Sequence, residues 1–164
     1  MLYKWLGAGM LLLAGGYAAV SMNRLEQRRL AVLDGYIALI RYIKGQINCY
    51  AMPIGDILAA ADPVLLRDCL GEGARHRSPL STVTLASMIQ AARLYLEPET
   101  ERLLSNFSKE LGHTFREEQV TRCDDYIIAL GEERRKLAEN VPMRERINSV
   151  LALSTALGMT ILLW

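Results

Sequence analysis

The sequence predicts an all-α protein, a bundle of about six helices between two terminal transmembrane helices. Apolar residues recur three and four apart through most of the middle of the chain, no segment alternates apolar and polar residues as a strand would, and both ends are almost uncharged. The predicted organisation is a transmembrane helix at residues 2–22, a helical bundle domain at residues 23–146 and a second transmembrane helix at residues 147–164.

The charges are confined to the middle of the chain. All 18 acidic residues and 18 of the 19 basic ones lie between Arg24 and Arg146, which leaves only Lys4 outside. Residues 5–22 and 147–164 are uncharged runs of 18 residues, and a helix of that length covers about 27 Å, close to the bilayer core of about 30 Å. A cleaved signal peptide is the alternative for the first run, and a buried core helix for the second.

Basic residues flank both uncharged runs on the side of the middle domain. Three follow the first run and five precede the second: Arg24, Arg28, Arg29, Arg134, Arg135, Lys136, Arg144 and Arg146. By the positive-inside rule, the domain between the runs is expected in the cytoplasm, with both termini outside the cell membrane.

The first long helix is expected to continue from the membrane segment, because no stop signal lies between Met22 and Leu30. Pro53 should end it or begin the next helix. Two neighbouring apolar stripes indicate a central place in the bundle, and their members are Leu30, Leu33, Ile37, Ile40, Ile47 and Val32, Tyr36, Leu39, Ile43.

Two short helices are expected next, at residues 54–61 and 64–70. Asp62-Pro63 should end the first, and Gly71 and Gly73 should close the second. The polar and basic residues 71–79 are then expected to form the main exposed loop.

Two amphipathic helices follow, one from near Pro79 to just before Pro98 and one from Pro98 to Gly112. Their inward faces are expected to be Leu85, Met88, Ile89, Ala92, Leu96 and Leu103, Leu104, Phe107, Leu111.

Thr114 and Glu117 have the spacing of a capping box at the start of a last long helix. Pro142 is expected to kink or break that helix. Its seam should pack lengthwise against the first long helix and consists of Val120, Cys123, Ile127, Leu130, Arg134 and Leu137.

The sequence contains no phosphate loop, dinucleotide-binding glycine motif, serine elbow or zinc-binding His-Glu pair. The middle domain, with 18 acidic and 18 basic residues, is formally neutral, which argues against nucleic-acid binding. His76 and His113 lack companions at ligand spacing, and the three cysteines are interpreted as reduced thiols. The acidic pairs at 117–118, 124–125 and 132–133 are interpreted as a solvated face. We therefore expect no enzymatic activity, cofactor, metal or small-molecule substrate.

Two local patterns between the terminal apolar segments support a resemblance that spans the chain. One is the end of the first long helix, Ile47-Asn48-Cys49-Tyr50-Ala51-Met52-Pro53-Ile54, and the other is the turn Leu111-Gly112-His113-Thr114-Phe115-Arg116-Glu117-Glu118-Gln119. In order and spacing the chain resembles stage III sporulation protein AB of endospore-forming bacteria. Asn48 and Met52 depart from the acidic residue and the threonine usual there, whereas Gly112, Arg116, Glu117 and Gln119 agree.

The resemblance implies a non-enzymatic part of the sporulation channel, made in the mother cell and located in the outer forespore membrane. It also implies similarity to the cytoplasmic domains of type II secretion and type IV pilus platform proteins, which couple a cytoplasmic ATPase to a membrane complex. The implied partners are the sporulation ATPase, stage III sporulation protein AA, and other channel components.

Two surfaces are candidates for partner binding. The first is the turn with Gly112, Arg116, Glu117 and Gln119, and the second is the basic loop with Arg75 and Arg77. A wholly structural role for the turn, as a helix cap, is the alternative. A membrane-bound enzyme or lipid-handling protein is the alternative function, and it predicts a pocket lined by converging polar groups near the membrane.

Overall fold

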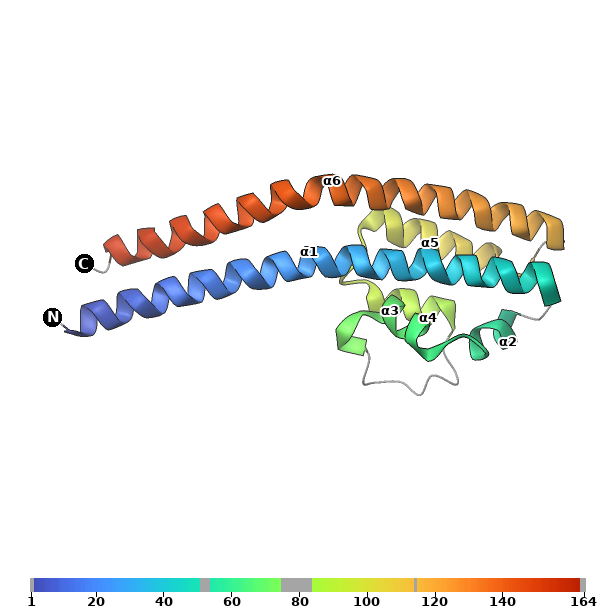
Figure 1. The fold of residues 1–164 in the computed structure, drawn as a ribbon, viewed down its shortest axis with the longest axis horizontal. Helices are drawn as coiled ribbons and strands as arrows, with labels where there is room; N and C mark the ends of the chain where they lie inside the picture. The colour runs from blue at the N-terminus through green and yellow to red at the C-terminus, as the bar shows by residue number, and fades with distance from the viewer. Residues whose placement is uncertain (1, 51–53, 75–83, 114, 163–164) are drawn as a thin grey trace. The chain divides into compact units, whose positions relative to one another are not determined.

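The structure is a computed structural model that describes residues 2–50, 54–74, 84–113 and 115–162. Side chains are described for most of these residues, the exceptions being 2–9, 11, 12, 50, 54, 71–74, 156, 160 and 162. The described residues form six helices and no strand, which confirms the all-α class (Figure 1).

Two long helices and four short ones make up this fold. In chain order their bounds are α1 Leu2–Tyr50, α2 Ile54–Ala59, α3 Pro63–Ala74, α4 Leu85–Ala92, α5 Pro98–Glu110 and α6 Arg116–Leu162. The expected continuation of the first helix through residues 22–30 is confirmed, since α1 is unbroken over 49 residues.

The chain divides into two compact units. Unit 1 consists of residues 1–27 and 137–164, and unit 2 of residues 28–136. Both α1 and α6 contribute a segment to each unit, whereas the four short helices belong to unit 2 alone.

Unit 2 has a single apolar core that the sequence periodicity locates well. On α1 the core contains eight of the nine expected stripe residues, and only Leu30 is half-buried. On α4 and the turn after it, the expected face is buried throughout, namely Leu85, Met88, Ile89, Ala92 and Leu96. On α5, Leu104 and Phe107 are buried, while Leu103 and Leu111 are half-buried.

The seam of α6 packs against α1 within unit 2, as expected. Cys123 and Leu130 are buried, whereas Val120 and Ile127 are half-buried at the margin of the seam. Leu137, the last seam residue, is also buried and belongs to the α6 segment of unit 1. Two ion pairs join the helices beside the seam, Lys44 Nζ to Asp124 Oδ1 at 2.6 Å and Arg134 Nε to Asp34 Oδ1 at 2.5 Å. Arg134, the charged residue of the seam, is therefore exposed and pairs with Asp34 instead of entering the core.

Close backbone packing joins α1 to α3. A Cβ atom at Gly35 would lie 3.0 Å from the carbonyl carbon of Asp68 and 3.1 Å from the amide nitrogen of Cys69. Only a residue without a side chain permits this approach. Gly35 therefore sets the distance between the two helices.

Three expected helix boundaries are wrong. The helix α3 continues through Gly71 and Gly73 to Ala74, so the first four residues of the expected loop are helical. Glycine in a helix costs only about 1 kcal/mol, which the buried Leu66, Cys69 and Leu70 of α3 offset. The other two wrong boundaries are the start of α4 and the expected break of α6 at Pro142.

The helix α4 is shorter than expected because a capping box fixes its start. Thr84 Oγ1 accepts from the amide of Ser87, and Ser87 Oγ accepts from the amide of Thr84. The helix ends at Ala92, and the chain then turns through Arg93–Leu96 before Pro98. Residues 79–83, where the helix was expected to begin, lie outside the described residues.

The helix α6 runs through Pro142 without ending. A proline removes one backbone hydrogen bond, and the helical turns on both sides continue without it. Of the two expected effects of Pro142, the break is therefore wrong, and the kink stays a prediction.

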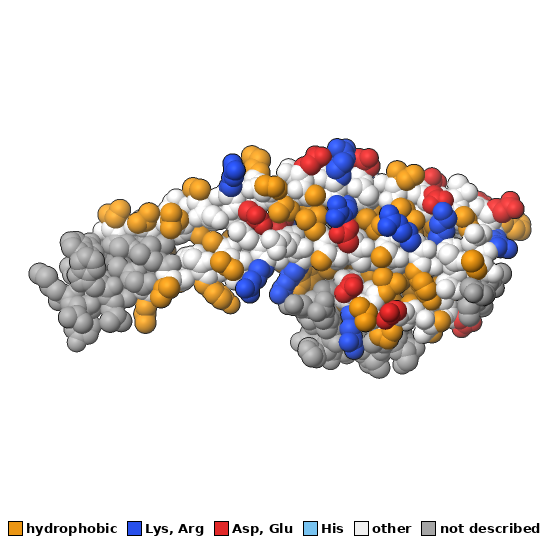
Figure 2. Space-filling model, viewed as in Figure 1, with side chains coloured by type: hydrophobic (Ala, Val, Ile, Leu, Met, Phe, Trp, Pro, Cys, Tyr) orange, Lys and Arg blue, Asp and Glu red, His pale blue; other side chains and the backbone are white. Residues whose placement is uncertain are grey.

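Unit 1 is a pair of helical segments with polar contacts at one end. Arg144 Nη1 lies 3.4 Å from Glu26 Oε2, and Gln27 Nε2 donates to Glu145 Oε1 at 3.4 Å. Glu26 is buried, so this pair holds the two segments in register. Beyond it, large apolar side chains lie on the surface, as the left part of Figure 2 shows.

Within the part of the chain that the structure describes, no helix is both long and apolar enough to cross a membrane. The predicted transmembrane segments at residues 2–22 and 147–164 are therefore not confirmed. Several side chains of both segments lie outside the description.

Candidate interaction surface

The turn between α5 and α6 depends on a glycine. Gly112 has φ 92°, a left-handed conformation that residues with a side chain rarely adopt. The amide of Leu111 donates to the carbonyl of Phe107 at 3.0 Å, and the amide of His113 donates to the carbonyl of Glu110 at 3.3 Å. The expected role of Gly112 as the breaker after this helix is confirmed.

Arg116 connects the start of α6 to the end of α1. Its guanidinium donates to the backbone carbonyl of Asn48, in the last turn of α1. The last carbonyls of a helix have no intrahelical partner and attract cations, yet α1 has no basic residue in its last turn. Arg116 supplies that cation from another element, which gives it a structural task that the sequence analysis did not foresee.

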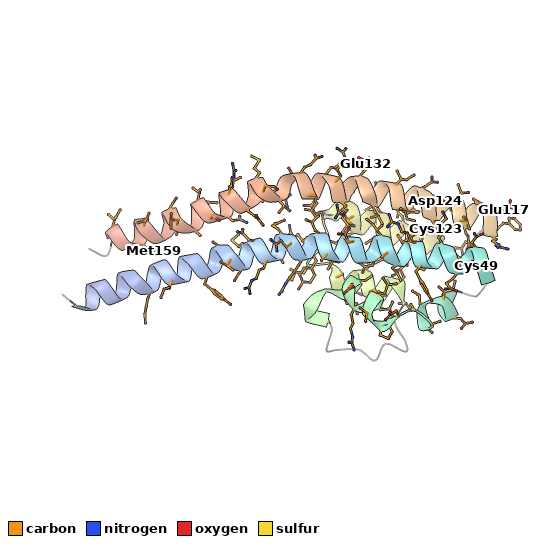
Figure 3. All side chains as sticks on the ribbon, viewed as in Figure 1. Cys49, Glu117, Cys123, Asp124, Glu132 and Met159 are labelled. Atoms are coloured by element: carbon orange, nitrogen blue, oxygen red, sulfur yellow. The ribbon has the colours of Figure 1, made fainter. Side chains whose placement is uncertain are left out.

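Figure 3 shows this end of unit 2, with Cys49 near the end of α1 and Glu117 at the start of α6. Glu117 is exposed, and its carbonyl accepts from Thr121 Oγ1 at 3.0 Å. Gln119 is half-buried, and its amide donates to the carbonyl of Phe115 at 2.9 Å. Glu117 and Glu118 place negative charge in the first turn of α6, where the helix dipole favours it.

A polar cluster holds the turn from the side of α5. Arg122 Nη1 lies 2.8 Å from Glu110 Oε2, and its Nη2 lies 2.8 Å from Glu118 Oε1. These hydrogen bonds to two carboxylates raise the pKa of Arg122. Tyr126 donates to Glu110 at 3.2 Å, and its ring packs edge-on against Phe107 with centroids 5.1 Å apart. The end of α5 and the start of α6 are thus fixed together.

Phe115 is the residue at this turn that the sequence analysis missed. Its side chain is 89% exposed, more than any other large apolar side chain among the described residues. Its carbonyl accepts the first hydrogen bond of α6, which makes it the N-cap residue, although a phenylalanine ring cannot accept a capping hydrogen bond. The ring therefore contributes neither to the core nor to the cap.

We name the exposed residues at this end of unit 2 the tip surface, defined as Gly112, His113, Phe115, Arg116 and Glu117. Thr114, the expected partner of Glu117 in a capping box, lies outside the described residues, as do Arg75 and Arg77 of the second candidate surface.

The described residues contain no metal-binding cluster, and two of the three cysteines are buried. No cluster of three His, Cys, Asp or Glu side chains there could bind a metal ion. Burial raises the pKa of Cys69 to about 12 and that of Cys123 to about 11, so both thiols stay protonated. Cys49 is exposed. His76 lies outside the description, and His113 is exposed.

The adjacent acidic pairs serve ion pairing along α6. Asp124 pairs with Lys44 across to α1, whereas Glu132 and Glu133 pair with Arg135 and Lys136 one turn along α6. These carboxylates do not converge on a common point.

Comparison with known proteins gives one match. A family model described as stage III sporulation protein AB matches residues 4–164. No curated protein and no solved structure matches the chain.

Proposed function

The chain belongs to the stage III sporulation protein AB family, which implies a role in sporulation, and from this premise we propose that it is a non-enzymatic platform of the sporulation channel. In this role it couples a cytoplasmic secretion-type ATPase to the membrane assembly. The observation that supports the proposal is that α1 and α6 each pass without a break from unit 1 to unit 2. A domain attached through two unbroken helices can transmit force or torque, whereas one attached through a single helix can swivel.

Unit 1 is the proposed membrane anchor, in the outer forespore membrane on the mother-cell side. The uncharged runs at residues 5–22 and 147–164 support this assignment, and so do exposed apolar side chains such as Leu13, Tyr17 and Leu153. The basic residues next to both runs support a cytoplasmic position for unit 2, with both termini outside.

The tip surface is the proposed docking site for the ATPase, stage III sporulation protein AA. Phe115 supplies a large apolar side chain with no role in folding, and aromatic side chains dominate the binding energy of many interfaces. Arg116 and Glu117 follow it in sequence and are exposed, Gln119 is half-buried one turn along α6, and Gly112 sets the turn. Arg116 also fastens α1, so its removal affects stability as well as binding.

The test is affinity capture of the ATPase by the tagged full-length chain in sporulating cells. Phe115→Ser should abolish capture and leave the melting temperature unchanged, because the ring is exposed. Ile128→Ser is the matched control, since Ile128 is an exposed apolar residue of α6 outside the tip surface, and it should capture normally. Normal capture by Phe115→Ser would remove the tip surface as the docking site, and failure of the parent chain to capture the ATPase would refute the coupling role.

The alternative of a membrane-bound enzyme or lipid-handling protein predicts converging polar groups in a pocket near the membrane, that is, in unit 1, the proposed anchor. Unit 1 contains a groove of about 320 Å³ whose lining is mostly apolar, with Asn148 and Thr155 as its polar members. The Thr155 hydroxyl already donates to the carbonyl of Leu151 at 2.7 Å. The groove thus offers little to a reacting group, and the platform is the better supported function.

A further inference from the structure

A groove of about 280 Å³ lies between α4 and α5 in unit 2, away from the residues of the tip surface. Its walls come from both helices and from the turn after α4: Ala86, Ile89, Gln90, Arg93, Glu101, Ser105, Ser108 and Lys109. The two helices are antiparallel here, since Arg93 at the end of α4 pairs with Glu101 near the start of α5.

Most polar side chains of this groove are unused. Gln90, Ser105, Ser108 and Lys109 have no hydrogen-bond or ion-pair partner among the residues that the structure describes. Arg93 uses only its Nε, which lies 3.1 Å from Glu101 Oε1 and 3.2 Å from Oε2, so its two terminal nitrogens are also unpartnered. One short groove thus presents several donors that folding does not employ.

The charges of these groups favour an anion. Arg93 and Lys109 are cations, and the carboxylate of Glu101 neutralises one of them, so the lining has one net positive charge. The neutral side chains add two hydroxyl donors and an amide donor. Carboxylate oxygens accept hydrogen bonds from all these donors, and such charge-assisted bonds are about twice as strong as neutral ones.

The length and floor of the groove favour a peptide over a single ion. Its lining extends from Ala86 to Arg93 on one side, a helical rise of about 10 Å, and from Glu101 to Lys109 on the other, about 12 Å. Ala86, which is exposed, and Ile89, which is almost fully buried, are the apolar members of the lining. An amphipathic segment with carboxylates beside small apolar residues matches this arrangement.

We propose that the groove between α4 and α5 binds an acidic segment of a partner protein, with Lys109 and Arg93 as the cations that receive its carboxylates. This inference is independent of the proposed function, because no residue of the groove belongs to the tip surface.

The test uses the full-length chain in detergent micelles and a fluorescent helical peptide in which glutamates and leucines repeat at helical spacing. We expect saturable binding that is lost when the glutamates of the peptide are replaced by glutamines. Lys109→Glu should weaken binding about tenfold or more, because it places like charges opposite each other. Gln90→Glu changes the charge at constant shape and should weaken binding in the same way.

The matched control is Arg102→Glu, a charge reversal on the same helix at an exposed residue outside the groove. It should bind the peptide like the parent chain. Equal binding by the parent and Lys109→Glu, or equal binding of the glutamate and glutamine peptides, would overturn the proposal.

A competition with inorganic phosphate separates a peptide groove from a simple anion site. If phosphate at the concentration of the peptide displaces none of the bound peptide, the result supports a peptide groove. Full displacement of the peptide would indicate a simple anion site instead. Unaltered melting of each variant shows that binding, and not folding, has changed.

Discussion

The segments of α1 in unit 1 and in unit 2 have similar apolar content and opposite burial. In unit 2, Tyr36, Leu39 and Ile40 are fully buried, whereas in unit 1 Leu13 and Tyr17 are more than three quarters exposed. The difference arises because the short helices and α6 cover α1 in unit 2, while unit 1 contains only two helical segments. Two helices cannot cover each other on all sides, so large apolar side chains of unit 1 stay on its surface.

This comparison predicts that unit 2 is sensitive to charge at its core. Leu130 is fully buried, so Leu130→Asp should place an unpaired carboxylate in the core and cost several kcal/mol, comparable with the total stability of a domain. Ile128→Asp is the control two residues away, where the side chain is 65% exposed, and it should change stability by about 0.5 kcal/mol at most. Urea unfolding followed by circular dichroism measures both. Equal effects of the two substitutions would mean that the seam of α6 is assigned to the wrong face.

The contact between α1 and α3 gives a second prediction. Gly35→Val should cost about 1 to 3 kcal/mol, because its side chain would meet the backbone of Asp68 and Cys69 and force the helices apart. Gly45→Ala, on the same helix with no atom within 4 Å of the added Cβ, should stabilise the protein by about 0.5 to 1 kcal/mol. Opposite signs in thermal unfolding are the expected result. Tolerance of Gly35→Val would show that α1 and α3 are not in close contact.

The buried thiols of unit 2 give a prediction about pH. Cys69 and Cys123 keep their protons in the folded state because burial raises their pKa values to about 12 and about 11, whereas an unfolded thiol titrates near pH 8.5. Above pH 8.5 the unfolded chain therefore holds fewer protons, and stability must fall as pH rises, by up to about 1.4 kcal/mol per thiol for each pH unit. Urea midpoints measured at about pH 7.5, 9 and 10 should fall less with rising pH for a Cys69→Ala/Cys123→Ala variant than for the parent. Parallel declines would contradict the burial of these thiols.

The sequence predicts the core of unit 2 better than its edges. Helical periodicity identifies the buried stripes of α1 and α4, because burial on one face dictates the spacing of apolar residues. It places Ile127 in the seam although Ile127 is half-buried, since the pattern cannot distinguish the centre of a stripe from its margin. Helix ends such as that of α3 escape prediction, because tertiary packing outweighs the local cost of glycine.

The tip surface was predictable only in part. The positive φ of Gly112 follows from its place after an amphipathic helix. The bond from Arg116 to the carbonyl of Asn48 joins residues 68 positions apart, and no local pattern encodes it. One sequence signal existed, the lack of any basic residue in the last turn of α1, which left the end of that helix without a cation.

The last prediction concerns unit 1, where a charge on an exposed apolar residue should not change the stability of the fold. Val150 is 64% exposed, so Val150→Asp should leave the melting of the full-length chain in detergent micelles within about 0.5 kcal/mol of the parent, because no core contact is lost. The same substitution should reduce recovery of the chain in the membrane fraction of cells, since an aspartate in a membrane helix is costly, by about 2.5 to 3.5 kcal/mol at the centre and by less toward an end, where Val150 lies. Val150→Leu serves as the apolar control and should behave like the parent in both measurements. A loss of stability as large as that of Leu130→Asp would mean that the surface of unit 1 is covered within the chain, and the contrast between the two units would then be false.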